Sequence, residues 1–301
     1  MKIVILSGGS GSSAIQRQLH RYLPDAQLTF LVNAYDDGGS TGAVRSLVHC
    51  LGPSDIRKVH LLQHELRYGR RSALADLVEL RVPTRRSWSF ILLTARRQLC
   101  SGSFSDCLRA ELLPTLDTLE QCVTDDLLPC DTMCIGNLFY AGFAQQADLA
   151  SGMRRMEGLL GLRAGTVVLN SHERLKLRAS CTDGRLLPDE AAISNYWSAS
   201  PRIATLHFVD SAGLPCRPSV SAEAAHALSS CDLCVVAPGT QLSSIVPTLM
   251  TDGLLLPACS YFVMNARDDG GPDRPGCRRH HRLVAASHWP SPTSRRLCRE
   301  R

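Results

Sequence analysis

The sequence predicts an α/β fold: a Rossmann-like three-layer sandwich with a mainly parallel sheet. Two strand–loop–helix junctions support this prediction, one at residues 1–19 and one at residues 233–245. Between them, apolar runs of strand length alternate with stretches of helical spacing, which is the pattern of βαβ units. At 301 residues the chain is long enough for one large domain. We expect a single α/β domain at 1–269 with a helical insertion at about 72–128.

The first junction joins the apolar run Met1–Leu6 to a helix that starts near Ala14. Unpaired N–H groups at the positive end of a helix attract anions, and glycine lets a phosphate approach the main chain closely. We therefore predict a phosphate-binding loop made of Gly8, Gly9, Ser10, Gly11 and Ser12. Residues 9–14 also fit a G-x-G-x-x-A dinucleotide fingerprint. That nicotinamide interpretation is less favoured because it does not explain the acidic segment that follows.

A second predicted strand, residues 28–32, runs into a polar segment that ends at Gly42. The segment contains the predicted ligand-binding residues Asn33, Asp36, Asp37, Gly38, Gly39 and Ser40. Carboxylates beside phosphates usually require a bridging cation, because like charges repel. We therefore predict Mg²⁺ as a cofactor, held by Asp37 and Asp55. The alternative is an ordinary solvated turn, since Asp and Gly are turn formers.

Three further polar residues are candidates for the same site. Asp55 follows a Gly-Pro-Ser turn, with Ser54 or Asp55 as the expected N-cap of a helix, and it could be a metal ligand or a general base. Arg57 could clamp a phosphate, or instead form a surface ion pair. Asn137, expected at a helix N-terminus, could be a cap or a ligand-binding residue. Asp37, Asp55 and Arg57 are the predicted catalytic residues.

The rest of the chain continues the alternation. Residues 72–128 have helical spacing, with Pro114 expected to kink or end one helix. Further elements are predicted as strands at 166–169, 175–179, 203–209, 233–237 and 261–265, a turn at 182–184 and a helix at 220–230. The strand at 233–237 leads into the second loop, with Pro238, Gly239, Thr240, Ser243 and Ser244. Two such loops in one sheet could hold a dinucleotide or a nucleoside diphosphate ester.

Composition narrows the function classes. The net charge of +5 is spread along the chain, with no basic run interleaved with aromatics, so we expect no nucleic-acid partner. No apolar stretch reaches the roughly 18 residues of a membrane span, and no secretory h-region is present, so we expect a cytoplasmic protein without a membrane partner. The 13 cysteines are an odd number in a long chain, which favours reduced thiols. Residues 270–301 lose apolar periodicity and are expected to form a disordered or aberrant tail.

The motifs and their order also resemble those of a known protein superfamily. Gly8–Gly11, Asn33–Gly42, Gly52–Arg57, Ile135–Leu138 and Ala237–Thr240 occur in the order seen in the CofD/YvcK superfamily, over roughly residues 1–265. CofD is the 2-phospho-L-lactate transferase of deazaflavin coenzyme synthesis, and YvcK is a nucleotide-sugar-binding factor. The long Asn33–Gly42 string is the specific part of the match, and the family keeps Gly-Asn beside its ligand at the position of Asn137. Relatives continue with structured sequence after residue 270, so a frameshifted end is one interpretation of the tail.

The resemblance implies a Mg²⁺-assisted transferase that acts on a nucleotide-linked donor, of the phospho-L-lactate type. Its alternative is a non-catalytic UDP-sugar-binding factor, similar to YvcK, that regulates carbon metabolism or cell-wall synthesis. The transferase branch carries a second acid where this chain has Arg57, which puts the deazaflavin acceptor in doubt. The base, sugar and acceptor stay open, as do turnover and a homo-oligomeric state.

Overall fold

The computed structural model describes residues 1–83, 87–101, 104–124, 128, 130–196 and 200–263. The chain forms two compact units: unit 1 comprises Met1–Tyr35 and the chain from Leu169 onward, and unit 2 comprises Asp36–Val168. The first crossing between the units therefore falls inside the Asn33–Gly42 segment. The predicted tail and residues 264–265 of the last predicted strand lie outside the described residues.

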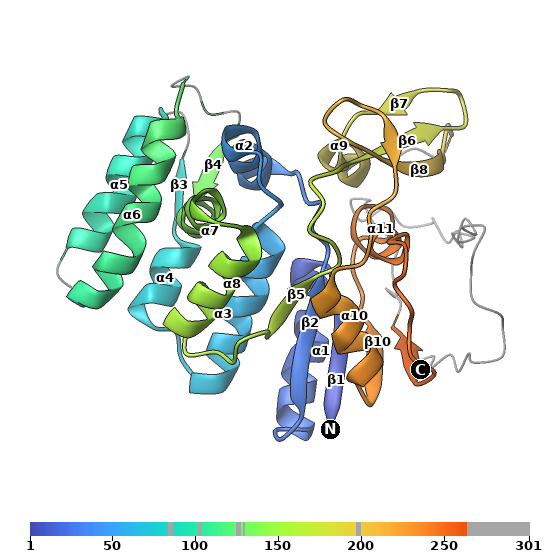
Figure 1. The fold of residues 1–301 in the computed structure, drawn as a ribbon, viewed down its shortest axis with the longest axis horizontal. Helices are drawn as coiled ribbons and strands as arrows, with labels where there is room; N and C mark the ends of the chain where they lie inside the picture. The colour runs from blue at the N-terminus through green and yellow to red at the C-terminus, as the bar shows by residue number, and fades with distance from the viewer. Residues whose placement is uncertain (84–86, 102–103, 125–127, 129, 197–199, 264–301) are drawn as a thin grey trace, which may run out of the picture. The chain divides into compact units, whose positions relative to one another are not determined.

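Unit 1 is built on a five-stranded sheet in the order β11-β10-β1-β2-β5 (Figure 1). Its strands are β1 (Lys2–Ser7), β2 (Gln27–Val32), β10 (Leu233–Val236) and β11 (Ser260–Phe262), together with β5 (Val167–Leu169), along which the chain passes from unit 2 back to unit 1. The pairs β1–β2, β1–β10 and β10–β11 are parallel. Strands β1 and β10 are apolar runs buried along most of their length, as expected for a parallel sheet covered on both faces. The predicted α/β fold with a mainly parallel sheet is confirmed.

The strand order places a topological switch point between β1 and β10. The chain leaves β1 for β2 on one side, through helix α1 (Ser13–Tyr22), while β10 pairs on the other side after helix α10 (Ala222–Ser230). In open α/β sheets, ligands bind beyond the carboxyl ends of the strands that flank such a point. The glycine loop follows β1 and the second loop follows β10, so both lie at this position.

Unit 1 also contains a four-stranded antiparallel sheet in the order β7-β6-β8-β9, which the sequence did not separate from the parallel one. Its elements are β6 (Lys176–Cys181), β7 (Leu186–Leu187), α9 (Glu190–Asn195), β8 (Ile203–Val209) and β9 (Pro215–Cys216). The predicted turn before β7 is confirmed, with Gly184 at φ +84°. Tyr35 packs in this sheet's core, its ring centroid 4.6 Å from that of Phe208.

Unit 2 is mostly helical. Its elements are α2 (Gly39–Val48), α3 (Ser54–Tyr68), α4 (Ala73–Glu79), β3 (Arg81–Pro83), α5 (Trp88–Cys100), α6 (Asp106–Cys122), β4 (Thr132–Cys134), α7 (Ile135–Gln146) and α8 (Leu149–Leu159). Within the stretch at 72–128, for which helical spacing predicts helices, the structure has α4, α5 and α6 together with the short strand β3. Pro114 lies inside α6, so the expectation that it could end a helix is wrong: α6 continues to Cys122. Most side chains of α7 are buried, and α6 and α8 pack against it.

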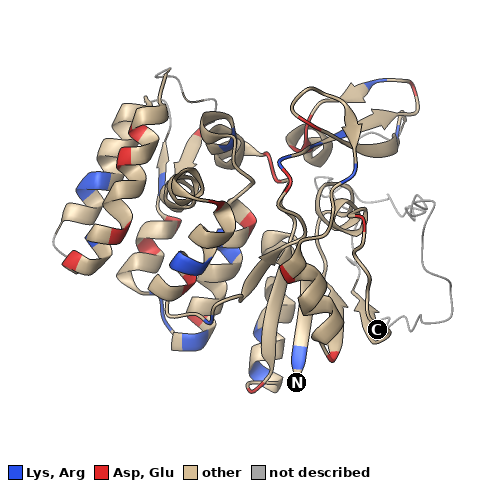
Figure 2. Ribbon diagram, in the orientation of Figure 1, with Lys and Arg blue, Asp and Glu red and all other residues tan. Residues whose placement is uncertain are grey.

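Charged residues of both signs are interspersed along the helices of unit 2, as Figure 2 shows. Arg96 of α5, for example, pairs with Asp117 and Glu120 of α6. Among the described residues, no helix combines the length and the apolar character that crossing a membrane requires.

Candidate functional site

The glycine loop after β1 is shaped by close backbone packing. Residues Gly9–Ser12 form a short 3₁₀ turn that leads into α1. A Cβ on Gly11 would lie 2.5 Å from the carbonyl oxygen of Pro238, and one on Gly8 would lie 2.7 Å from Cβ of Ser244. Gly9 has φ +62°, a conformation that favours glycine. The glycines therefore let the loop after β1 approach the loop after β10, which brings the two predicted junctions together.

Inside the loop, Ser12 is fully buried and holds the turn together. Its hydroxyl lies 2.5 Å from that of Ser7, accepts a hydrogen bond from Nε2 of Gln16 at 2.7 Å, and donates to the carbonyl oxygen of Gly9 at 3.3 Å. Ser10 and Gly11 are exposed instead. The outward-facing part of the loop is thus Ser10–Gly11, while the side chain of Ser12 shapes the turn from within.

The second loop presents a cluster of hydroxyl groups. Oγ of Ser243 donates to Oγ1 of Thr240 at 2.7 Å, and Oγ of Ser244 lies 2.9 Å from the same Thr240 oxygen. Gln241–Ile245 form a π-helical turn, a feature often found at functional sites, and α11 (Val246–Leu249) follows. Because α11 has only four residues, the helix-dipole argument for phosphate binding applies to α1 and not to α11.

Two asparagines form hydrogen bonds at the carboxyl end of β2. Nδ2 of Asn33 donates to the carbonyl oxygen of Ser243 at 2.9 Å, which ties β2 to the second loop. Asn170 is fully buried; its Oδ1 accepts from the N–H of Ala34 at 3.0 Å and its Nδ2 donates to Oγ1 of Thr251 at 2.9 Å. Sequence reasoning missed Asn170, although a polar residue directly after the buried strand β5 was a usable signal.

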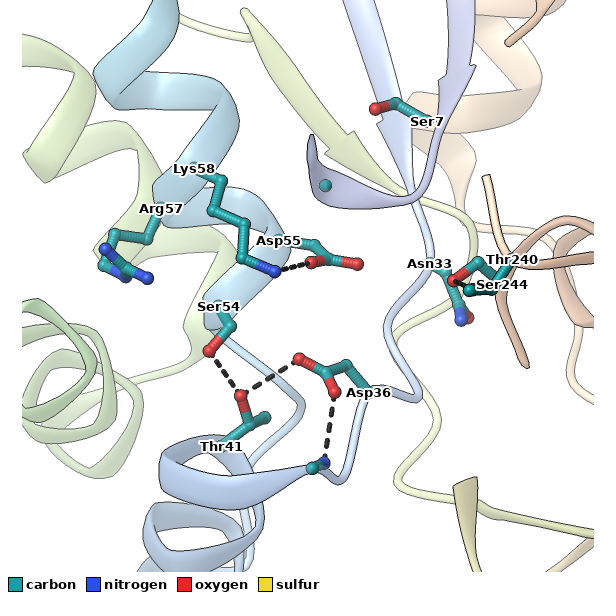
Figure 3. Close-up of polar contacts among 12 residues, drawn as sticks. Ser7, Asn33, Asp36, Thr41, Ser54, Asp55, Arg57, Lys58, Thr240 and Ser244 are labelled. Atoms are coloured by element: carbon teal, nitrogen blue, oxygen red, sulfur yellow. Dashed lines mark hydrogen bonds and ion pairs between the residues drawn. The ribbon is translucent and has the colours of Figure 1, made fainter. Parts of the chain in front are cut away.

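In unit 2, Asp36 organises the turn at the start of α2. Its Oδ1 accepts from the N–H of Gly38 at 3.1 Å and its Oδ2 accepts from Oγ1 of Thr41 at 3.0 Å; Thr41 is also hydrogen-bonded to the hydroxyl of Ser54 (Figure 3). Gly39, at φ +49°, begins α2. Asp36 therefore joins the N-terminal ends of α2 and α3.

Each of the two carboxylates predicted to hold Mg²⁺ lies near a positively charged side chain of the same unit. Oδ1 of Asp37 lies 3.6 Å from Nη1 of Arg45, and Oδ1 of Asp55 accepts from Nζ of Lys58 at 2.8 Å. Burial raises the pKa of Asp55, opposed by the Lys58 charge, and nearby Asp36 raises it further. Burial opposes ionisation of Lys58, but the Asp55 carboxylate outweighs it and the pKa of Lys58 is raised.

Asp55 does not cap α3. The N-cap is Pro53, and no side chain caps the helix, so the expected capping by Ser54 or Asp55 is wrong. The two side chains have other partners: the Ser54 hydroxyl bonds Thr41 and Asn137, and Asp55 bonds Lys58. A carboxylate buried beside an ammonium in this way is held in a defined position, as a binding or proton-accepting group requires.

Arg57 and Asn137 belong to one buried network. Arg57 is fully buried, its Nη1 pairs with the carboxylate of Glu79, and its Nε donates to Oδ1 of Asn137 at 3.2 Å. Nδ2 of Asn137 then donates to the hydroxyls of Ser40 and Ser54, each at 2.9 Å. Asn137 lies in the first turn of α7, whose N-cap is Cys134, so the cap interpretation is wrong.

The residues of unit 2 fit Mg²⁺ only as part of a larger ligand set. Among the residues that the structure describes, no group of three or more His, Cys, Asp or Glu side chains could hold a metal ion. Mg²⁺ is commonly bound by one or two carboxylates together with phosphate oxygens of a substrate. Asp37 and Asp55 are the two carboxylates that the sequence predicts for such a site, and in this structure they lie near Arg45 and Lys58, respectively.

Comparison with known proteins agrees with this fold and motif set. A model of the family described as 2-phospho-L-lactate transferase CofD matches residues 3–256. A gluconeogenesis factor from Halalkalibacterium halodurans is 23% identical over 279 residues, which cover 89% of this chain and 69% of that protein. The one from Bacillus subtilis is 24% identical over 276 residues, covering 90% and 69%, and a putative one from Nostoc sp. is 25% identical over 254 residues, covering 84% and 43%.

Solved structures show the same fold. The crystal structure of a UPF0052 family member from Bacillus halodurans has a TM-score of 0.58 and 22% identity, covering 84% of this chain and 63% of that one. The chain therefore spans less than two thirds of that structure and under half of the Nostoc relative.

Proposed function

The chain belongs to the CofD family, and we propose that it binds a nucleoside diphosphate ester with the two loops that follow β1 and β10. The observation that carries the proposal is their position: both loops lie at the switch point of the parallel sheet, where α/β proteins bind ligands. The ten-residue helix α1 begins directly behind the first loop and offers its positive end to a phosphate. Thr240 and Ser244 add hydroxyl groups from the second.

We favour binding without turnover. The curated relatives cited above are named gluconeogenesis factors. The resemblance described above also implies that the transferase branch carries a second acid where this chain has Arg57. In this proposal the protein is a nucleotide-sugar sensor in the cytoplasm, with no nucleic-acid or membrane partner.

A transferase is the second candidate, and Asp55 is the observation in its favour. A buried carboxylate with a raised pKa is suited to accept a proton from an acceptor hydroxyl. The hydroxyl oxygen would bond to the β-phosphorus of the ester. The bond from this phosphorus to the bridging oxygen would break, and the nucleoside monophosphate would leave with the bonding electrons. Catalysis would then come mainly from positioning and charge stabilisation.

Mg²⁺ belongs to both versions of the proposal. It would be held by Asp37 and Asp55 together with the phosphates and would neutralise their charge. In both versions the role of Asp36 is to hold the turn before α2 through Gly38 and Thr41.

A thermal-shift screen with UDP, GDP, UDP-glucose and NAD, each with Mg²⁺ or with EDTA, tests the function. Binding to the native state raises stability by RT ln(1 + [L]/Kd), about 2.7 kcal/mol at a hundredfold excess over Kd. We expect stabilisation by a nucleoside diphosphate or its sugar ester, larger with Mg²⁺, and a smaller Mg²⁺ effect in Asp37→Asn. Stabilisation by NAD alone would overturn the proposal.

Two variants and one assay complete the test. Thr240→Val removes an exposed hydroxyl of the second loop and should weaken binding, whereas Thr205→Val, at an exposed position of β8, should not. Incubation of the bound ester with candidate acceptor alcohols, followed by chromatography of the nucleotides, separates the two versions: release of nucleoside monophosphate identifies the transferase.

A further inference from the structure

We propose that Gln16 and Ser12 are positioning residues of the glycine loop, and that together they keep the N–H group of Ser10 directed towards a phosphate of the bound nucleotide ester. All three residues belong to unit 1, as do the two loops of the proposed site. The inference rests on the proposed function. It replaces the direct phosphate contact that the sequence predicted for the side chain of Ser12.

Gln16 is a buried polar residue in a position that an apolar one could fill. Of the ten residues of α1 it is the buried one, with an exposure of 0%, whereas Ile15 and Leu19 are only half-buried. A buried amide lowers stability unless its polar atoms find hydrogen-bond partners. Nε2 of Gln16 donates to Oγ of Ser12 at 2.7 Å. The amide therefore points to a requirement at Ser12.

The hydroxyl group of Ser12 uses its hydrogen-bonding capacity inside the protein. A hydroxyl has one donor and two acceptor positions. Oγ of Ser12 donates to the carbonyl oxygen of Gly9 at 3.3 Å and accepts from Gln16. Because its one proton is directed at Gly9, its second acceptor position takes the proton of the Ser7 hydroxyl, 2.5 Å away. Ser12 therefore has no donor left for a phosphate, and Gln16 helps to keep its proton on the Gly9 carbonyl.

The contact with Gly9 sets the direction of the peptide group that follows it. The Gly9–Ser10 peptide bond is trans, so its C=O and N–H point in opposite directions. The Gly9 carbonyl faces the buried hydroxyl of Ser12, and the N–H of Ser10 consequently faces the other side, where Ser10 and Gly11 are exposed. Ser10 is also the second residue of the 3₁₀ turn, where N–H groups have no acceptor within the turn.

Loss of either buried side chain would allow this peptide group to rotate. Gly9 has φ +62° and lacks a Cβ, so its backbone resists such a rotation little. A rotated peptide would present the partly negative Gly9 carbonyl oxygen to the phosphate in place of the Ser10 N–H. The alternative is a network that stabilises the turn and has no influence on the ligand.

The two roles differ in what they predict for the Ser10 amide and for affinity. A hydrogen bond from an N–H to a phosphate is charge-assisted, and it moves the amide proton resonance downfield. Its loss should weaken binding of UDP or GDP by about tenfold to a hundredfold. Because Gln16 acts through Ser12, removing both side chains should weaken binding no more than removing one. A purely stabilising network would change the free energy of unfolding and leave both readouts unchanged.

The experiment adds UDP or GDP to the isotope-labelled full chain and follows the Ser10 amide by NMR and the affinity by calorimetry. Gln16→Leu, Ser12→Ala and the double variant are compared with Gln18→Leu, a matched control at an exposed position of the same helix. We expect a downfield shift of the Ser10 amide proton in the wild-type protein and in Gln18→Leu. In the other three variants we expect that shift to be lost and binding to be weakened to a similar extent. Urea denaturation without ligand shows that each variant is folded.

The outcomes separate this inference from the function beneath it. If the wild-type protein binds a nucleotide and its Ser10 amide does not move, the inference is wrong and the proposed function stands. The same holds if Gln16→Leu matches Gln18→Leu in affinity and in the Ser10 shift. Should Gln16→Leu fail to fold, Ser12→Ala decides by the same two readouts. A wild-type protein that binds neither UDP nor GDP overturns both the inference and the function.

Discussion

Gly11 passes so close to Pro238 that a Cβ atom at position 11 would lie 2.5 Å from the Pro238 carbonyl oxygen. Because the Pro238 carbonyl oxygen belongs to the backbone, a change of side-chain rotamer cannot relieve this clash. Glycine at position 11 is therefore needed for the loops after β1 and β10 to pack together, in addition to any role in binding phosphate.

We predict that Gly11→Ala lowers the free energy of unfolding by roughly 1–3 kcal/mol, the usual range for overpacking a close-packed site. Urea denaturation measures it. Gly158→Ala is the matched control: Gly158 is exposed in α8 with no atom within 4 Å of an added Cβ, so alanine there should stabilise the helix by up to about 1 kcal/mol. Equal stability of the two variants would contradict the packing argument.

The buried Arg57–Glu79 pair leads to a second prediction. Arg57→Met leaves the Glu79 carboxylate and Oδ1 of Asn137 without their partner, and breaking a buried pair typically costs about 3–5 kcal/mol. Because Glu79 is 33% exposed, the lower end of that range is expected. Arg96→Met, which removes the two ion pairs to the exposed carboxylates of Asp117 and Glu120, should cost at most about 1 kcal/mol. Chemical denaturation of both variants checks the difference, which would vanish if Arg57 were an ordinary surface residue.

Asn170 supports a third prediction. Asn170→Ala leaves the N–H of Ala34 and the hydroxyl of Thr251 without the bonds that Asn170 provides, and an unsatisfied buried group costs about 1–3 kcal/mol. Thermal unfolding of Asn170→Ala should show the loss, whereas Asn195→Ala, at the exposed end of α9, should leave stability nearly unchanged. Hydrogen exchange at Ala34 should also accelerate, and unchanged protection there would argue against the role of Asn170.

Thiol reactivity provides a fourth prediction. Burial raises the pKa of Cys234 to about 12, which keeps it as the unreactive thiol at pH 8; its thiolate fraction grows only as the pH approaches that value. Cys107 and Cys259 are exposed. Mass spectrometry after iodoacetamide treatment at pH 8 should find these two alkylated and Cys234 unmodified. Rapid labelling of Cys234 in the folded protein would contradict its burial.

Local sequence patterns were sufficient to predict the fold class and several individual elements, because these patterns report burial directly. The apolar run of β1, the spacing of α4 to α6 and the turn at Gly184 follow from rules that operate within a few residues. The same patterns could not assign β6 and β8 to a separate antiparallel sheet. Strand partnership depends on which segments meet, as in the pairing of Leu177 with Phe208.

Some features of the candidate site also follow from local sequence, whereas others depend on tertiary structure. The sequence by itself identified the two loops, the acidic segment and the family that they resemble, because glycine, serine and aspartate are required locally by turns and anion-binding backbone. Tertiary structure alone decided which charged side chain is buried. Arg57 and Lys58 are neighbours in sequence, yet one faces Glu79 and Asn137 while the other bonds Asp55 beside solvent. The partners of Arg57 lie 22 and 80 residues away along the chain, a separation that no local pattern records.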